Sequence, residues 1–162
     1  MVRKRMPRTQ DTSGVHVWLV LMKTFQALAA VAEKSLDVRL TGLGDSDFRV
    51  LEALLHKGPL PVNTIGPKVW LTPGSISVAV DRLEQKRLVE RQNTDDRRVR
   101  QVELTAKGRT LITKTFREHA AAMEEVAAVL SKRVRLILLR LLKKLGKGEA
   151  RKTGVQISEK RP

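Results

Sequence analysis

The chain has 162 residues, a formal net charge of +15 at pH 7 and a pI of about 10.9. This length suits one domain with a hydrophobic core, and the charge favours a polyanionic partner, either nucleic acid or an anionic membrane surface. The absence of cysteine excludes disulfides, thiolate metal sites and cysteine-based redox switches.

The N-terminal part of the sequence divides into a basic tail and one long helix. Residues 1–13 are basic and poor in apolar side chains, which predicts a disordered tail. Residues 14–44 contain a helix from Val15 to about Leu40, in which Lys23 and Gln26 interrupt an apolar run. We interpret this run as a buried helix, rather than a signal peptide or a membrane span, and place the protein in the cytoplasm. The apolar positions recur at helical spacing: Trp18, Leu21, Met22, Phe25, Leu28, Ala29, Ala32 and Leu36.

Three shorter helices are expected next. Asp45 or Gly44 caps the first, Asn63 caps the second, and Thr72 followed by Pro73 begins the third. Helical periodicity predicts that the first and the third bury these side chains: Phe48, Leu51, Leu54, Leu55, Ile76, Ala79, Val80 and Leu83.

A β-hairpin and two further helices complete the predicted elements. The stretches "LVERQ" and "VRQVELT" flank the turn-rich "NTDDRR" and predict a two-stranded hairpin. Thr105 and Ser131 cap two helices within residues 105–147, the second of which ends at Gly146. The polar residues 148–162 are expected to form a disordered tail.

A helix-turn-helix followed by such a wing, here residues 45–104, is typical of a unit that reads nucleic acid. We expect the helix at about 73–88 to enter the major groove and the wing at about 94–99 to enter the minor groove, where Asp96 orients an inserted Arg98. Arg82 either contacts phosphate or forms a surface pair with Asp81 or Glu84. The candidate DNA-binding residues are Thr72, Pro73, Gly74, Ser75, Ser77, Val78, Arg82, Asp96, Arg97, Arg98 and Arg100.

The stretches "LPVNTIGPKVWLTPGSISVAVDRLEQKRLVER" and "DRRVRQVELTAKG" resemble the winged-helix core of the multiple-antibiotic-resistance regulator (MarR) family. The motif positions are Asp96, Arg98, Leu104, Thr105 and Gly108. The resemblance implies a mainly α fold with a small β-hairpin wing and with N- and C-terminal dimerisation helices. It also implies a ligand-responsive homodimer, most often a repressor, and a two-fold dimer predicts a pseudo-palindromic operator.

Three features depart from the family pattern. Arg87 stands where the family usually has glycine, and because a left-handed cap would cost an arginine about 1 kcal/mol, we expect this helix to end in another way. Val78 replaces a side chain that is often polar, although its methyl groups suit contact with a thymine methyl group. Lys132 and Arg133 oppose the dipole of their helix, which either indicates a surface facing DNA or an acidic partner, or has no functional meaning.

We expect the aromatic side chains, including Phe116, to pack in the core. The alternative is that some of them line a cleft between the dimer helices and the winged helix, which binds a small phenolic or aromatic ligand. The candidate ligand-binding residues are Trp18, Met22, Phe25, Phe48 and Trp70.

No cofactor, metal site or enzymatic activity is expected. The three histidines, His16, His56 and His119, fall on separate elements, and no arrangement of nucleophile, base and acid is visible. The alternative to a sequence-specific DNA-binding regulator is a winged-helix module that binds an acidic protein.

Overall fold

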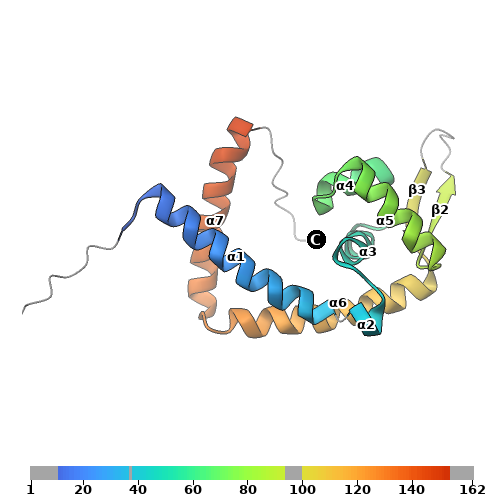
Figure 1. The fold of residues 1–162 in the computed structure, drawn as a ribbon, viewed down its shortest axis with the longest axis horizontal. Helices are drawn as coiled ribbons and strands as arrows, with labels where there is room; N and C mark the ends of the chain where they lie inside the picture. Colours follow the sequence, from blue (N-terminus) through green and yellow to red (C-terminus); the bar gives the residue numbers. More distant parts are fainter. Residues whose placement is uncertain (1–10, 37, 94–99, 154–162) are drawn as a thin grey trace, which may run out of the picture.

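A computed structural model of the chain describes residues 11–36, 38–93 and 100–153, and one long helix joins its two parts (Figure 1). The first part, which we call the winged-helix unit, contains three helices and a small sheet. Its elements are α3 (Asp45–Lys57), β1 (Leu60–Pro61), α4 (Val62–Val69), α5 (Pro73–Gln85), β2 (Val89–Asn93) and β3 (Arg100–Leu104). This arrangement confirms the predicted mainly α fold with a small wing.

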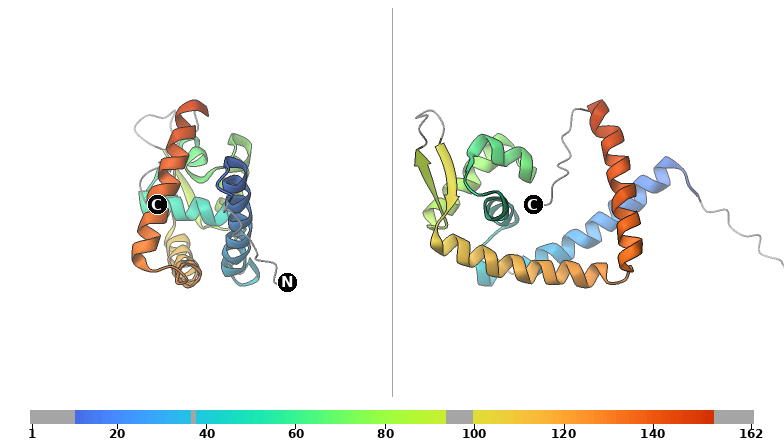
Figure 2. Two further views of the ribbon diagram at one scale, coloured as in Figure 1. Left: turned by 90° about the vertical axis from the view of Figure 1, so that its left-hand side faces the viewer. Right: turned by 180° about the vertical axis from the view of Figure 1, so that it is seen from behind.

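The second part contains the remaining helices. They are α1 (Gly14–Leu36), α2 (Val38–Thr41), α6 (Ala106–Ala127) and α7 (Lys132–Thr153). Helix α6 leaves the winged-helix unit and packs against α1, while α7 stands across the far end of α6 (Figures 1 and 2). Helices α1 and α7 therefore extend away from the unit that carries the candidate DNA-binding residues.

The sheet has three antiparallel strands in the order β1-β3-β2, where a two-stranded hairpin was expected. Leu60 pairs with Val102, and β2 pairs with β3 from Val89–Leu104 to Asn93–Arg100. The extra strand is only two residues long and contains a proline, which is tolerated at a sheet edge because no ladder N–H is needed there.

One hydrophobic core lies between the helices and the sheet of the winged-helix unit. The predicted inward faces of α3 and α5 are buried as expected, apart from Leu55, which is partly buried. Further buried side chains come from α3, α4, α6, the strands, the end of α1 and the segments just before α3 and β2. These additional core residues are Leu36, Leu43, Val50, Ala53, Ile65, Val69, Leu88, Val89, Val102 and Ile112.

Local cap signals locate the start of three helices. The side-chain oxygens of Thr72, Thr105 and Ser131 accept hydrogen bonds from the N–H groups of Ser75 (3.2 Å), Gly108 (3.0 Å) and Val134 (3.4 Å), respectively. These three caps confirm the predicted starts, because each satisfies a backbone donor that the first helical turn leaves free.

Helix α3 begins after Gly44, one of the two predicted caps, although Gly44 provides no side-chain hydrogen bond. Two other boundaries differ from the predictions. Helix α4 begins after Pro61 and not after Asn63, and Pro67 lies inside it. Helix α7 continues through Gly146 to Thr153, so the helix includes the first six residues of the tail that was predicted to begin at 148. A glycine weakens a helix interior without necessarily ending it.

Helix α5 ends in the left-handed cap that was not expected there. Arg87 has φ of 57°, its N–H donates to the Glu84 carbonyl (2.8 Å), and the Leu88 N–H donates to the Leu83 carbonyl (3.0 Å). This is a Schellman motif. The prediction was wrong because the burial of Leu88, which follows the cap and closes the motif, offsets the backbone cost of an arginine.

Helix α1 is not buried within the chain, contrary to the prediction. Leu36 is its only buried residue, whereas Trp18 is 61% exposed and Phe25 is also exposed. The helix is long and apolar enough to cross a membrane by length and composition alone. Its packing on α6 shows instead that part of its apolar surface contacts the chain itself.

Candidate nucleic-acid interface

The N-terminal turn of α5 presents hydroxyl groups to solvent. Thr72 Oγ1 accepts from the Ser75 N–H and donates to Ser75 Oγ at 2.9 Å. The Ser75 hydroxyl proton is then available to another acceptor, such as a phosphate or a base edge. Ser77 Oγ donates back to the Pro73 carbonyl at 3.1 Å, which leaves its lone pairs as acceptors.

The rest of this face is open and small. Pro73 and Gly74 are exposed, and a Cβ added to Gly74 would meet nothing within 4 Å. Val78 is 60% exposed, and it lies one helical turn from Gly74, on the same side of α5. The predicted residues from Thr72 to Val78 therefore share a surface that is exposed in the described part of the chain.

Arg82 forms neither of the surface pairs considered for it. Its Nε and Nη2 donate to the carboxylate of Asp47 on α3, with an Nε–Oδ1 distance of 2.9 Å, and Nη2 also reaches Ser46 Oγ at 3.0 Å. Lys86 Nζ donates to the same carboxylate at 3.0 Å and to the Gly42 carbonyl. Phosphate contact by Arg82, whose side chain is 40% exposed, is still only a prediction.

Asp47 is the buried centre of this network, with 1% of its surface exposed. Burial alone would raise the pKa of Asp47, but the hydrogen bonds and positive charges of Arg82 and Lys86 outweigh burial and hold the pKa below its ordinary value. The charged network joins α3 to α5 and fixes the orientation of α5 in the winged-helix unit.

A second charged contact joins α5 to the base of the wing. Arg91 on β2 donates through Nη2 to Asp81 and through Nη1 to Glu84, both on α5. Arg100 is exposed at the far end of β3, where it pairs with Asn93. The predicted minor-groove residues Asp96, Arg97 and Arg98 lie outside the described residues.

The Leu-Thr-x-x-Gly motif has a structural role at the joint between α5 and α6. A Cβ on Gly108 would lie 1.9 Å from the Leu88 carbonyl oxygen, so that only glycine fits. The Thr105 N–H donates to the same carbonyl (3.1 Å), and its hydroxyl donates to the carbonyl of Arg87 (2.8 Å). Together with Lys107 Nζ on the Lys86 carbonyl (3.0 Å), these contacts fix the start of α6 against the end of α5.

The five candidate ligand-binding residues have very different environments. Phe48 is buried, and its ring centroid lies 5.0 Å from that of His119 on α6. Trp18, Met22 and Phe25 are on the outer part of α1. Trp70, 71% exposed, ends α4 in a left-handed conformation with φ of 60°. The core prediction was therefore correct for Phe48 and wrong for Trp18, Phe25 and Trp70, while Phe116 is partly buried against the core.

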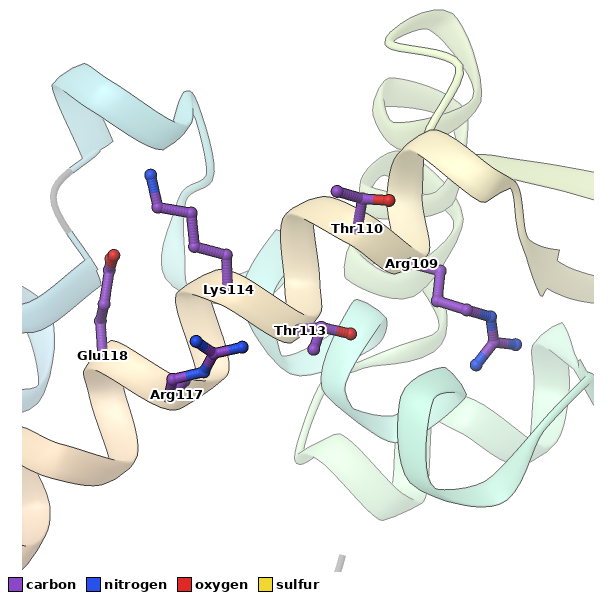
Figure 3. A pocket seen from close by; sticks show the side chains of 6 residues that line it. All are labelled: Arg109, Thr110, Thr113, Lys114, Arg117 and Glu118. Carbon is purple, nitrogen blue, oxygen red and sulfur yellow. The ribbon is translucent and has the colours of Figure 1, made fainter.

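An open hollow on α6 contains none of these five residues. Its lining side chains form two rows, Arg109, Thr113 and Arg117 in one and Thr110, Lys114 and Glu118 in the other (Figure 3). Residues four apart form a ridge along a helix surface, so the hollow is the groove between two ridges of a single exposed helix. Such a groove does not enclose a small molecule.

His119 joins α1, α3 and α6. Ser35 Oγ donates to the Ala32 carbonyl (2.6 Å) and lies 2.8 Å from His119 Nδ1. Because the hydroxyl has one proton, His119 must donate from Nδ1, and burial lowers its pKa. Within the described ranges, His, Asp and Glu side chains form no group of three that could hold a metal ion.

Sequence reasoning missed Asp47 and Arg91, although part of the signal is present. Asp47 lies on the face of its helix that carries Leu51 and Leu54, and an acid in an apolar stripe indicates a buried partner. Asp81 and Glu84 are three residues apart and therefore share one helix face, but nothing local identifies Arg91 as their partner.

Lys132 and Arg133 are the first two residues of α7, and both are exposed. Helix α7 starts at the end of α6 that is far from α5 (Figure 1).

Comparison with known proteins gives a consistent result for this geometry. Residues 41–99, which include helices α3, α4 and α5 and strand β2, match a model of the MarR family. The transcriptional regulator MhqR of Bacillus subtilis is 37% identical over 134 residues, which cover 82% of this chain and 91% of that protein. The transcriptional repressor MdtR of Bacillus subtilis is 31% identical over 102 residues, or 62% of this chain and 64% of that protein.

A solved structure supports the same fold. The crystal structure of NadR in complex with 4-hydroxyphenylacetate superposes with a TM-score of 0.67 at 23% identity, and the match covers 88% of this chain and 99% of that chain. At this identity the likeness concerns the fold alone. It includes the long helices outside the winged-helix unit, because the matched part is longer than that unit.

Proposed function

Because the chain belongs to the MarR family of DNA-binding transcriptional regulators, we propose that it acts as a repressor on a pseudo-palindromic operator. The N-terminal turn of α5 enters the major groove with Thr72, Ser75 and Ser77, and the wing enters the minor groove with Arg98. The observation that carries this proposal is the exposed hydroxyl-rich turn of α5 beside the wing base, on a chain of charge +15.

The operator is found by selecting bound duplexes from a random pool, and its affinity is then measured by fluorescence polarisation. Arg98→Ala is expected to weaken operator binding by about 1–3 kcal/mol per subunit, as for other specific contacts. Arg109→Ala removes the same charge from the exposed face of α6 and is the matched control. Equal effects of the two substitutions would contradict the role of Arg98.

The alternative, a module that binds an acidic protein, predicts a different salt dependence. Such a module would bind any duplex through charge alone, and physiological salt would weaken selected and random duplexes equally. A DNA-reading regulator keeps a preference for the selected duplex at physiological salt. A gel shift with both duplexes at two salt concentrations distinguishes these functions.

The proposed regulator is a homodimer formed through α1, α6 and α7. Helices α1 and α7 expose an apolar stripe each, including Trp18, Phe25, Ile137 and Leu141, and a second copy of the chain would bury these stripes. A two-fold dimer places the two α5 helices on half-sites about 34 Å apart. We place the dimer in the cytoplasm with its DNA, and we assign it no enzymatic activity.

A small phenolic compound is the proposed effector. NadR, which shares the fold, holds 4-hydroxyphenylacetate, and Trp18, Met22, Phe25 and Trp70 leave apolar surface accessible in the single chain. Trp18 and Trp70 are the only tryptophans in the sequence, so their fluorescence reports binding near either one. We expect 4-hydroxyphenylacetate to quench this fluorescence and to release the operator. Phenylacetate, which lacks the hydroxyl, is the control, and operator binding unchanged at saturating ligand would contradict this effector.

A further inference from the structure

We infer that Arg91 is a positioning residue for DNA recognition, which fixes the wing against the recognition helix α5 so that both approach the duplex as one unit. The inference rests on the proposed function for its meaning, but its geometry is independent of DNA. Arg91 contributes no surface to the exposed turn of α5, and it acts through the elements that it joins.

The position of Arg91 in the hairpin follows from the alternation of side chains along β2. Side chains alternate between the two faces of a strand, so Arg91 shares a face of β2 with Val89, which is buried. Opposite Arg91 in the ladder stands Val102, which is also buried. Arg91 therefore lies on the face of the hairpin that packs on the winged-helix core, at the point where the hairpin begins to leave it.

Arg91 contacts a pair of acids on α5. Asp81 and Glu84 are three residues apart, and the Arg91 guanidinium reaches both with separate nitrogens. A planar guanidinium held at two points resists rotation, unlike an ion pair with a single contact. The Arg91 side chain is 23% exposed, whereas Asp81 and Glu84 are 57% and 40% exposed, so solvent partly screens the attraction, and the contact matters chiefly for the geometry that it fixes.

Charged contacts hold α5 from two sides. Arg82 and Lys86 join it to Asp47 on α3, while Arg91 joins it to β2. Helix α5 lies between α3 and the hairpin (Figure 1). Without Arg91, the contacts between α5 and β2 near the start of the strand would remain, but the described part of the wing beyond Val89 would lose its charged contact with α5.

A wing that is fixed against α5 has a consequence for the specificity of DNA binding. Two rigidly related elements can contact adjacent grooves of a duplex without losing conformational freedom on binding, whereas a loosely held wing must be ordered by the DNA. The contribution of the wing to affinity should then depend on Arg91. This dependence distinguishes a positioning role from a general contribution to stability.

The first experiment measures the geometry without DNA. The chain has no cysteine, so spin labels can be placed specifically at Gln85→Cys on α5 and Gln92→Cys on β2, both exposed positions. The distance distribution between the labels is expected to be narrow with Arg91 and at least about twice as broad with Arg91→Ala, because the contact that orders the hairpin is lost. Equal widths would overturn the inference, whatever the function of the protein.

The second experiment is a double-mutant cycle on the selected operator. Arg98→Ala should reduce affinity at least about threefold less in an Arg91→Ala background than in the unaltered chain, because coupled residues are not additive. Ser75→Ala, on α5 itself, should cost the same in both backgrounds. Additive effects of Arg98→Ala and Arg91→Ala would overturn the inference, and a chain that selects no operator would overturn the proposed function.

Two further variants separate positioning from charge. Arg91→Lys keeps the positive charge, but a lysine cannot hold both carboxylates in a fixed plane. The lysine variant should therefore show the same broad distribution of label distances, and the same reduced effect of Arg98→Ala, as Arg91→Ala. Asp81→Asn with Glu84→Gln removes the acids that Arg91 neutralises. If these two substitutions restored full affinity to Arg91→Ala, Arg91 would act only by masking negative charge, and the inference would be wrong.

Discussion

The winged-helix unit buries its apolar side chains within the chain, whereas helices α1 and α7 expose many of theirs. In the unit, the apolar faces of α3 and α5 are buried within the chain, and Leu83 and Leu51 have no exposed surface. In α7, Leu141 is 59% exposed, although the helix is just as regular. The winged-helix unit therefore contains its own core, whereas α1 and α7 leave much of their apolar surface uncovered in the single chain.

The largest expected effect tests whether the unit depends on close packing at its joint with α6. Gly108→Ala should cost at least about 3 kcal/mol of unfolding free energy, because its Cβ would collide with the Leu88 carbonyl, a backbone atom that cannot rotate away. Urea unfolding at fixed protein concentration measures this loss. Gly74→Ala, in open space, should change stability by less than about 1 kcal/mol; similar values for the two variants would disprove the collision.

The next effect concerns the other side of the comparison. Ile137→Asp with Leu141→Asp places charge on the exposed stripe of α7, and it should weaken self-association at least about 100-fold without unfolding the winged-helix unit. Sedimentation equilibrium measures the association. Thr110→Asp with Thr113→Asp, on the polar exposed face of α6, should leave the dimer intact. A dimer that survives the α7 substitutions would show that another surface forms it.

A smaller effect tests the charged network inside the unit. Asp47→Asn should cost about 2 kcal/mol at neutral pH, less than a fully buried pair because its partners are partly exposed. The control is Asp45→Asn, whose pair with Arg49 is on the surface, and it should cost less than about 0.5 kcal/mol.

The same network gives a pH dependence with a defined sign. The folded pKa of Asp47 lies below its ordinary value of 3.8, so its ion pairs stabilise the folded state fully above the unfolded pKa and lose this effect as the pH falls through the folded pKa. The stability difference between the unaltered chain and Asp47→Asn should thus be constant above about pH 5 and decrease below it. A difference that grows on acidification would contradict the assignment.

The smallest effect sharpens the comparison at one backbone position. Arg87→Gly should stabilise the winged-helix unit by up to about 1 kcal/mol, because glycine adopts the left-handed cap of α5 without steric cost. Arg87→Ala keeps the steric cost and should give no such gain. Thermal unfolding of both variants measures the difference, and equal stability would indicate that the cap is not strained.

The sequence predicted what local chemistry determines. Thr72, Thr105 and Ser131 each accept a hydrogen bond from the backbone N–H three residues later, and so cap the helix that follows. The buried faces of α3 and α5 follow from helical periodicity. It did not predict contacts between distant segments: Asp47 meets Arg82, 35 residues later, and Gly108 meets Leu88. The left-handed Arg87 was missed for the same reason, because the burial of the next residue, and not local preference, determines the cap.

The ligand-binding predictions show another limit of periodicity. The apolar stripe of α1 indicates correctly that Trp18 and Phe25 belong on one side of a helix, but periodicity cannot distinguish a core within the chain from one shared with a second chain. For the same reason the candidate DNA-binding residues from Thr72 to Val78 could be placed at the start of α5 by their positions alone, while the pairing of Arg82 with Asp47 required the fold.

The tight joint between α5 and α6 makes the latter a lever. With 22 residues, α6 is about 33 Å long. A rotation of the whole helix by about five degrees about its far end would therefore displace the recognition helix α5 by about 3 Å. A molecule that binds between the outer helices α1 and α7 would not have to contact the surface that faces DNA. Helix α6 would transmit and amplify a small displacement of the outer helices, and α5 would then no longer fit the groove.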